Sequence, residues 1–225
     1  MTGSQGSSTR AFRYLDPELA DLLTRFGVDL VVDVGANRGQ FALELMRAGY
    51  EGRILSVEPL SEAHAELVAA SRDHPRWTAA ERCAVGDHEG TARLNVAGNS
   101  ESSSLLPMLA AHEAAAPRSA YVGSETVRLR RLDVVVADRV ARAQAPFLKL
   151  DVQGAERRAL DGATGLIDRL VGVQAELDLV PLYEGSRGFE EMLGSLRGVG
   201  FCLYRLRPGS TAPRSGRTLQ AAGLF

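Results

Sequence analysis

Small and acidic residues gather where the first β-branched run of this 225-residue chain ends, and they are Asp33, Gly35, Ala36, Asn37 and Gly39. Glycines have no side chain, so a ligand can approach the backbone where the next helix begins. A later apolar run ends in Glu58, 19 residues after Gly39. An acidic residue at this distance is typical of a carboxylate that accepts hydrogen bonds from ribose hydroxyls. We therefore expect an adenosine-bearing cofactor.

The first loop departs from the pattern that binds dinucleotides. That pattern needs three glycines so that a pyrophosphate can press onto the backbone. Here Asn37 stands at the second glycine position and Gln40 at the third. The preceding Asp33 suits a cationic ligand better than a diphosphate. S-adenosylmethionine carries a sulfonium and an ammonium group, whereas NAD carries a diphosphate, so the charge pattern favours S-adenosylmethionine.

Further small or polar residues end the later apolar runs. One group lies in the first half of the chain and comprises Pro59, Ala84, Val85 and Asp87. A second group is strongly charged and comprises Lys149, Asp151, Gln153, Glu156, Glu176 and Asp178. Ligands of open α/β sheets bind at the carboxyl ends of the strands. We therefore expect all of these residues to border one site.

Apolar runs alternate with helical periodicity along the chain. Short strands are predicted at 29–34, 53–57, 77–85, 146–152, 170–177, 201–206 and 218–225. Between most of them lie predicted helices, including one at 105–116 that Pro107 interrupts. Alternation of this kind predicts a mostly parallel seven-stranded sheet with helices on both faces. Segments 92–96 and 126–132 alternate apolar and polar residues, so we expect them to pair as an added β-ribbon.

The domain organisation follows from composition along the chain. Residues 1–13 are polar and rich in serine and glycine, and we expect a flexible tail. Residues 14–225 are expected to form a single α/β domain, because the length suits one domain better than two.

Several of these segments resemble the FkbM family of class I methyltransferases. The matching stretches are VDVGANRGQF at 32–41, VEP at 57–59, CAVGD at 83–87, LD at 132–133, LKLDVQGAE at 148–156 and VPLYEG at 180–185. The resemblance spans about 30–206. It implies a Rossmann-like fold and an S-adenosylmethionine-dependent enzyme that methylates a hydroxyl of a sugar, glycan or secondary metabolite.

The resemblance also implies roles for individual residues. The first-loop residues would face the methionine portion of the cofactor, and Glu58 would hold the ribose. Val85 and Asp87 would border the adenine, and Asp151 would sit beside the methyl group. Pro59, Ala84 and Ser103 are assigned to the cofactor pocket as well, although serines 102–104 could equally cap a helix. Tyr183 and Arg187 stand where an acceptor would bind.

Methylation of an alcohol needs a proton acceptor or a metal ion, because a neutral hydroxyl is a weak nucleophile. The candidate bases are Asp151, Glu156, Glu176 and His112, although His112 is expected to be a solvated surface residue. Lys149 could act as a base only if desolvation lowered its pKa. Alternatively, one magnesium ion could be held by three carboxylates, Asp151, Glu176 and Asp178. The sequence does not choose between these routes, and Asp151, Lys149 and Glu176 are the residues assigned to catalysis.

Composition excludes several classes of protein. The 45% of hydrophobic residues excludes general disorder, and a net charge of −2 argues against a dedicated nucleic-acid binder. The chain has no apolar run near the ~20 residues of a membrane helix, and its first residues do not resemble a signal peptide. Two cysteines, Cys83 and Cys202, are expected to be buried free thiols in a reducing cytoplasm.

Two other functions compete with the methyltransferase hypothesis. An NAD-dependent oxidoreductase would share the fold, but the chain lacks the glycine triplet. The tyrosine–lysine pair of short-chain dehydrogenases is excluded, because Ala145 stands four residues before Lys149, the only lysine. A catalytically inactive scaffold that still binds the cofactor would keep the same motifs. A homodimer is also compatible with the predicted ribbon.

Overall fold

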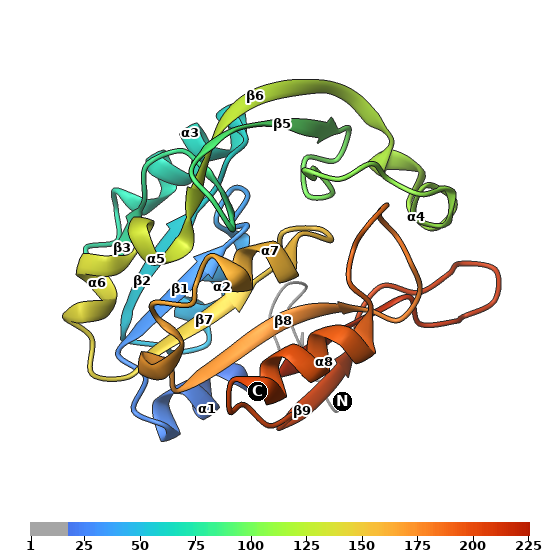
Figure 1. The fold of residues 1–225 in the computed structure, drawn as a ribbon. Coiled ribbons are helices and arrows are strands. Elements are labelled where there is room, and N and C mark those ends of the chain that lie inside the picture. Colours follow the sequence, from blue (N-terminus) through green and yellow to red (C-terminus); the bar gives the residue numbers. More distant parts are fainter. Residues whose placement is uncertain (1–17) are drawn as a thin grey trace, which may run out of the picture.

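The structure is a computed structural model that describes residues 18–225, so the expected tail at 1–13 lies outside the described part. Its centre is a seven-stranded sheet with the order β3-β2-β1-β7-β8-β10-β9 (Figure 1). The strands in this order are Trp77–Ala79, Arg53–Val57, Leu30–Val34, Pro146–Leu150, Gly172–Asp178, Gln220–Leu224 and Arg205–Pro208. The first five run parallel and β10 is antiparallel to both of its neighbours. The predicted mostly parallel sheet is therefore confirmed.

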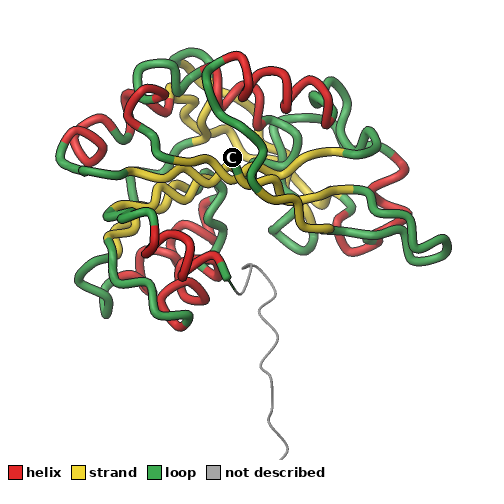
Figure 2. The backbone as a smooth tube through the Cα atoms, turned by 90° about the horizontal axis from the view of Figure 1, so that it is seen from below, coloured by secondary structure: helices red, strands yellow, loops and turns green. Residues whose placement is uncertain are grey.

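Helices cover both faces of this sheet (Figure 2). One face packs against α1 (Leu19–Arg25), α2 (Gln40–Arg47) and α3 (Ser61–Ser71). The other face packs against α5 (Leu132–Val135), α6 (Ala137–Ala141), α7 (Glu156–Asp161) and α8 (Phe189–Gly198). The strands alternate accordingly, since Val31 and Phe147 join the first layer while Val32 and Leu148 join the second. A sheet buried on both faces explains why its strands read as continuous apolar runs.

The predicted ribbon is part of a second, three-stranded sheet with the order β4-β6-β5. Its antiparallel pair, β5 (Gly90–Ala97) and β6 (Tyr121–Arg131), confirms the expected pairing. These two strands arch above the carboxyl ends of the main sheet (Figure 1).

The single strand predicted at 77–85 is wrong, because the structure splits it. Trp77–Ala79 pairs with β2 as β3, whereas Ala84–Gly86 leaves the main sheet and pairs with β6 as β4. The side chain of Cys83, between the two strands, enters the main core. An apolar run shows that its residues are buried but does not show which strand they will pair with.

Two smaller expectations also need correction. The helix predicted at 105–116 is reduced to α4 (Ala110–Ala115), because Pro107 and an extended Leu109 precede it. Cys83 is buried as expected, but Cys202 is exposed.

Short 3-10 turns at Pro117–Ser119 and Ile167–Arg169 complete the elements. Within residues 18–225, no helix has the length and apolar character that crossing a membrane requires.

Candidate active site

The turn after β1 is built around a close approach of two backbones. Gly35 has a φ of +79°, and a Cβ atom placed there would lie 1.8 Å from the carbonyl oxygen of Asp151. Only glycine allows the loop after β1 to touch the loop after β7 in this way. Asn37, with a φ of 46°, continues the turn, and Gly39 precedes α2. The glycine spacing seen in the sequence therefore brings the ends of two neighbouring strands together.

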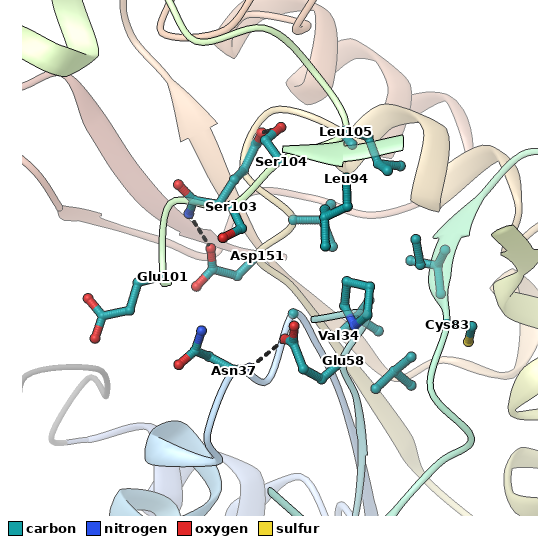
Figure 3. A pocket seen from close by; sticks show the side chains of 18 of the residues that line it. Val34, Asn37, Glu58, Cys83, Leu94, Glu101, Ser103, Ser104, Leu105 and Asp151 are labelled. Carbon is teal, nitrogen blue, oxygen red and sulfur yellow. Dashed lines mark hydrogen bonds between the residues drawn. The ribbon is translucent and has the colours of Figure 1, made fainter. Parts of the chain in front are cut away.

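A cavity opens beside this turn, and we call it the strand-end cavity. Eight of the residues predicted to bind a cofactor line it, namely Gly35, Asn37, Glu58, Pro59, Ala84, Val85, Ser103 and Asp151. Figure 3 shows Asn37, Glu58 and Asp151 around the same space. Leu94 of β5 and Leu105 complete an apolar wall, and Cys83 also lines the cavity. The cavity thus pairs an apolar slot with carboxylates.

Glu58 is held in place by backbone amides. Its Oε2 accepts the N–H of Asn37 at 2.7 Å and its Oε1 accepts the N–H of Leu60 at 2.8 Å. Burial raises the pKa of Glu58 to about 7, although these two hydrogen bonds act in the opposite direction. A carboxylate oxygen has two lone pairs, so each oxygen of Glu58 keeps one for a ligand.

The loop at 98–104 closes the cavity from the ribbon side. Asn37 Nδ2 donates to Ser100 Oγ at 3.2 Å, which ties this loop to the first one. Ser104 Oγ donates to the backbone oxygen of Gln153 at 2.6 Å. The hydroxyl oxygen of Ser103 accepts the N–H of Ala97 at 3.0 Å. Ser100 and Glu101 line the cavity too, but sequence reasoning missed them because nothing distinguishes them from other polar loop residues.

Lys149 lies in a buried polar row that crosses the sheet. Ser56, Asp33 and Lys149 are register partners on β2, β1 and β7, so their side chains share one face. Lys149 Nζ lies 2.9 Å from Asp33 Oδ1 and 3.6 Å from Asp151 Oδ2. Burial alone would lower the pKa of Lys149, but the negative charges of Asp33, Asp151 and Glu176 raise it above its ordinary value. This direction keeps Lys149 protonated and contradicts its use as a base.

A second and larger cavity, of about 610 Å³, lies over the same face of the sheet, and we call it the open cleft. Its floor comes from β7, β8, β10 and β9 and includes Lys149, Gln174, Glu176, Gln220, Ala222, Arg205 and Arg207. Gly35, Asn37, Glu101, Asp151 and Gln153 line both cavities. The two spaces therefore meet beside Asp151.

Two amide side chains link the carboxylates of the open cleft. Gln153 Nε2 donates to Asp151 Oδ1 at 2.7 Å and to Glu176 Oε2 at 3.0 Å. Gln220 Nε2 donates to Glu176 Oε2 at 2.9 Å and to Asp178 Oδ1 at 3.1 Å. Gln220 was missed in the sequence, because it lies on an apolar closing strand far from the motifs.

These hydrogen bonds do not suit a magnesium site on Asp151, Glu176 and Asp178, which the sequence left open. N–H donors occupy the spaces between Asp151, Glu176 and Asp178, where a cation would need oxygen atoms. Among residues 18–225 there is no group of three or more His, Cys, Asp or Glu residues that could hold a metal ion. The residues present therefore do not fit a magnesium ion at this place.

The buried carboxyls nearby hold their protons unusually well. Burial raises the pKa of Glu176 well above its ordinary value, and the charges of Asp151, Glu156 and Asp178 add to the effect. Burial, with the charge of Asp178, also raises the pKa of Glu156 to about 8. Glu156 accepts the N–H of Val152 at 2.9 Å, so it shapes the loop after β7.

A family model, the methyltransferase FkbM domain, matches residues 33–203. The chain belongs to the FkbM methyltransferase family. None of the proteins with curated functions matches it in sequence.

Solved structures of methyltransferases are similar to this chain at low sequence identity. The methyltransferase domain of bacterial CtHen1 is 11% identical, with a TM-score of 0.51 over 92% of this chain and 94% of that one. A putative RNA methyltransferase from Pyrococcus horikoshii is 14% identical, with a TM-score of 0.48 over 92% and 79%. Magnesium protoporphyrin IX methyltransferase from Synechocystis PCC 6803, with bound S-adenosylmethionine, is 13% identical, with a TM-score of 0.46 over 92% and 75%. The likeness to the CtHen1 domain concerns the fold alone, and nothing is concluded from the other two.

Four residues predicted to contact the cofactor of this FkbM methyltransferase lie outside the strand-end cavity. Asp33 is wholly buried beneath Lys149, and Ala36 lines only the open cleft. A Cβ atom on Gly39 would meet the ring of Trp77, so this glycine serves the packing of α2. Asp87 is exposed and its Oδ1 lies 2.7 Å from His88 Nδ1, away from the cavity.

His112 and Tyr183 differ from what the sequence indicated. His112 is only 7% exposed rather than solvated, and it lines the open cleft with its Nδ1 buried and without a hydrogen-bond partner. Burial lowers the pKa of His112. Tyr183 was assigned to acceptor binding, but it is buried and donates to Gln153 Oε1 at 2.7 Å. It orients the amide that bridges Asp151 and Glu176.

Proposed function

We propose that this FkbM methyltransferase uses S-adenosylmethionine to methylate a hydroxyl group of a sugar, glycan or secondary metabolite. The observation that carries the proposal is the meeting of two cavities at Asp151. One cavity has the chemistry of an adenosine site, and the other is a polar space large enough for an acceptor. A group-transfer enzyme needs its two substrates to meet at one point.

The residues of the strand-end cavity fit S-adenosylmethionine. Pro59, Ala84, Val85 and Leu94 offer apolar surface for the adenine. Glu58 has free lone pairs for two ribose hydroxyls, and Asp151 stands where a carboxylate would face a cationic centre. When bound, the cofactor supplies an electrophilic methyl group. The chain then has to position the hydroxyl and take up its proton.

Glu176 is our choice for the proton acceptor. A general base works best when its pKa lies near the operating pH, and burial moves the pKa of Glu176 in that direction. Gln153 and Gln220 both donate to Oε2 of Glu176 and so fix its carboxyl group. Protonated Lys149 holds Asp33 and lies near Asp151, which keeps the negative charge of the site in place. Positioning of this kind supplies much of the rate in a displacement reaction.

Calorimetric titration with S-adenosylmethionine tests the proposal, with NAD as the comparison ligand. We expect the methyl donor to bind and NAD to give no heat. No heat from the methyl donor up to millimolar concentration would remove the proposal, and binding of NAD in its place would favour the oxidoreductase.

Transfer itself separates an enzyme from an inactive scaffold. We expect methyl-labelled S-adenosylmethionine to label a mixture of polyhydroxylated acceptors in the presence of the wild-type chain, and Glu176→Gln to abolish the labelling without loss of cofactor binding. Equal labelling by both chains would exclude Glu176 as the base.

A further inference from the structure

The floor of the open cleft follows the register of the sheet. Glu176 on β8, Ala222 on β10 and Arg207 on β9 are successive partners, and so are Gln174, Leu224 and Arg205. Register partners project their side chains to the same face of a sheet. All six residues accordingly line the open cleft. Two parallel rows of side chains therefore run from β8 across β10 to the edge strand β9.

Opposite charges lie at the two ends of these rows. Asp151 and Glu176 provide carboxylates at the β7–β8 end, whereas Arg205 and Arg207 provide guanidinium groups on β9. Two strand spacings, or about 10 Å, separate β8 from β9. Ala222 lies between Glu176 and Arg207, and its small side chain keeps the floor between them low. A ligand can therefore lie along the row and touch both ends.

Arg205 already shows that a carboxylate can be held at this edge. Its Nη2 lies 2.8 Å from Glu18 Oε2, and the side chain of Glu18 is 69% exposed. An ion pair as exposed as this contributes at most about 1 kcal/mol. A carboxylate or phosphate on a bound ligand can thus compete with Glu18 for Arg205 and gain the charge-assisted bonds for which arginine is suited.

We propose that the acceptor is a polyhydroxylated molecule that carries an anionic group, a carboxylate or a phosphate, which Arg205 and Arg207 bind. This inference rests on the proposed function and names the acceptor class of the same site. The anionic end lies over β9, and the hydroxyl to be methylated faces Asp151 and Glu176. The reverse orientation would place the anion beside Asp151 and Glu176 and away from both guanidinium groups, so the cleft selects one direction of binding.

Nuclear magnetic resonance of arginine side chains provides the test. The Nε–H signals of Arg205 and Arg207, assigned from single variants, are followed during titration with glucuronate, glucose 6-phosphate and neutral glucose. We expect both anions to shift these two signals and glucose to leave them in place. Whichever anion binds more tightly distinguishes a uronic acid from a sugar phosphate.

Two variants test whether the anions bind at Arg205 and Arg207. Arg205→Gln/Arg207→Gln should weaken binding of the anions by about tenfold or more, whereas Arg197→Gln on α8 should not change it. Equal affinity in the double variant, or no shift by either anion up to 50 mM (about the weakest binding of interest), would overturn the inference. Calorimetry with S-adenosylmethionine on the same samples keeps the two proposals apart. If the wild-type chain binds the cofactor but not the anions, only the acceptor class is refuted. If the wild-type chain does not bind the cofactor, the proposed function is refuted.

Discussion

The strand-end cavity and the open cleft hold their carboxylates by different means. In the strand-end cavity, backbone N–H groups of Asn37 and Leu60 hold Glu58. In the open cleft, side-chain amides of Gln153 and Gln220 hold Asp151 and Glu176. One region therefore depends on the path of the chain, and the other depends on which side chains stand at particular register positions.

We interpret this difference as a division between a region that binds one fixed ligand and a region that selects among ligands. A backbone-built site tolerates many changes in side chain, because the donors belong to the main chain. A site built from side chains changes its specificity when one of them is replaced, without a change of fold. We expect the strand-end cavity to serve a fixed ligand and the open cleft to determine the acceptor. The variants that follow test this division, from the largest expected effect to the smallest.

Lys149→Met should have the largest effect, because it removes the counter-ion of the buried Asp33, which keeps a hydrogen bond from Ser56 but loses its ion pair. Loss of one member of a buried ion pair costs about 3–5 kcal/mol, and urea denaturation measures it. Arg187→Met, which breaks an exposed pair with Glu191, should cost less than about 1 kcal/mol. Similar losses in the two variants would show that the buried pair does not support the fold. The double variant Asp33→Asn/Lys149→Met should recover much of the stability.

Gly35→Ala should come next, because it attacks the contact that both cavities share. A Cβ atom would collide with the carbonyl oxygen of Asp151, at a distance of 1.8 Å. We expect a loss of about 3 kcal/mol or more in the free energy of unfolding. Gly27→Ala is the matched control, since Gly27 has a φ of +66° with nothing within 4 Å of a Cβ atom. It should cost only about 1–2 kcal/mol.

Gln153→Glu should destabilise the open cleft by about 1–3 kcal/mol, because a third carboxylate replaces an amide donor between Asp151 and Glu176. The new carboxyl group would also complete a cluster of oxygen ligands. We therefore expect millimolar magnesium to raise the melting temperature of this variant but not of the wild-type chain. Gln144→Glu, at an exposed position, serves as the control. A magnesium response of the wild-type chain would contradict our view of the cleft.

Glu58→Gln should lower the affinity for S-adenosylmethionine about tenfold, because the ribose loses a charge-assisted hydrogen-bond acceptor. In the wild-type chain the ionised form of Glu58 is the better acceptor, and its pKa is raised to about 7. The affinity of the wild-type chain for S-adenosylmethionine should therefore increase as the pH rises through 7. The affinity of the variant should not depend on pH in this range. Calorimetry at pH 6 and pH 8 (about one unit on either side) measures both. A pH dependence that persists in the variant would assign it to another group.

Asp87→Ala should have the smallest effect. Its carboxylate is exposed and lies beside His88, outside the strand-end cavity. We expect the affinity for S-adenosylmethionine to stay within about twofold of the wild-type value, which is below 0.5 kcal/mol. A loss as large as that of Glu58→Gln would show that Asp87 turns toward the adenine when the cofactor binds.

The same division explains how far the sequence could be interpreted. The main sheet and the ribbon pairing follow from apolar periodicity, and Gly35, Asn37, Glu58 and Asp151 follow from their places next to strand ends. Ser103 was assigned only from the family resemblance, and Ser100 and Glu101 were missed. No sequence motif marks Gln220, Arg205 or Arg207. Only the register of β8, β10 and β9 places them at the site. The division of 77–85 between β3 and β4 was also beyond reach, because strand partners are set by tertiary packing.

Lys149 is the only lysine among 26 basic residues, and it is 4% exposed. The folded chain consequently offers acylating and cross-linking reagents no accessible ε-amino group. Modification of Lys149 by an amine-directed reagent requires its ion pair with Asp33 to break and the packing around it to open first. The rate of that reaction would time the opening of the core, so a single peptide mass could follow the unfolding of the protein in a crude mixture.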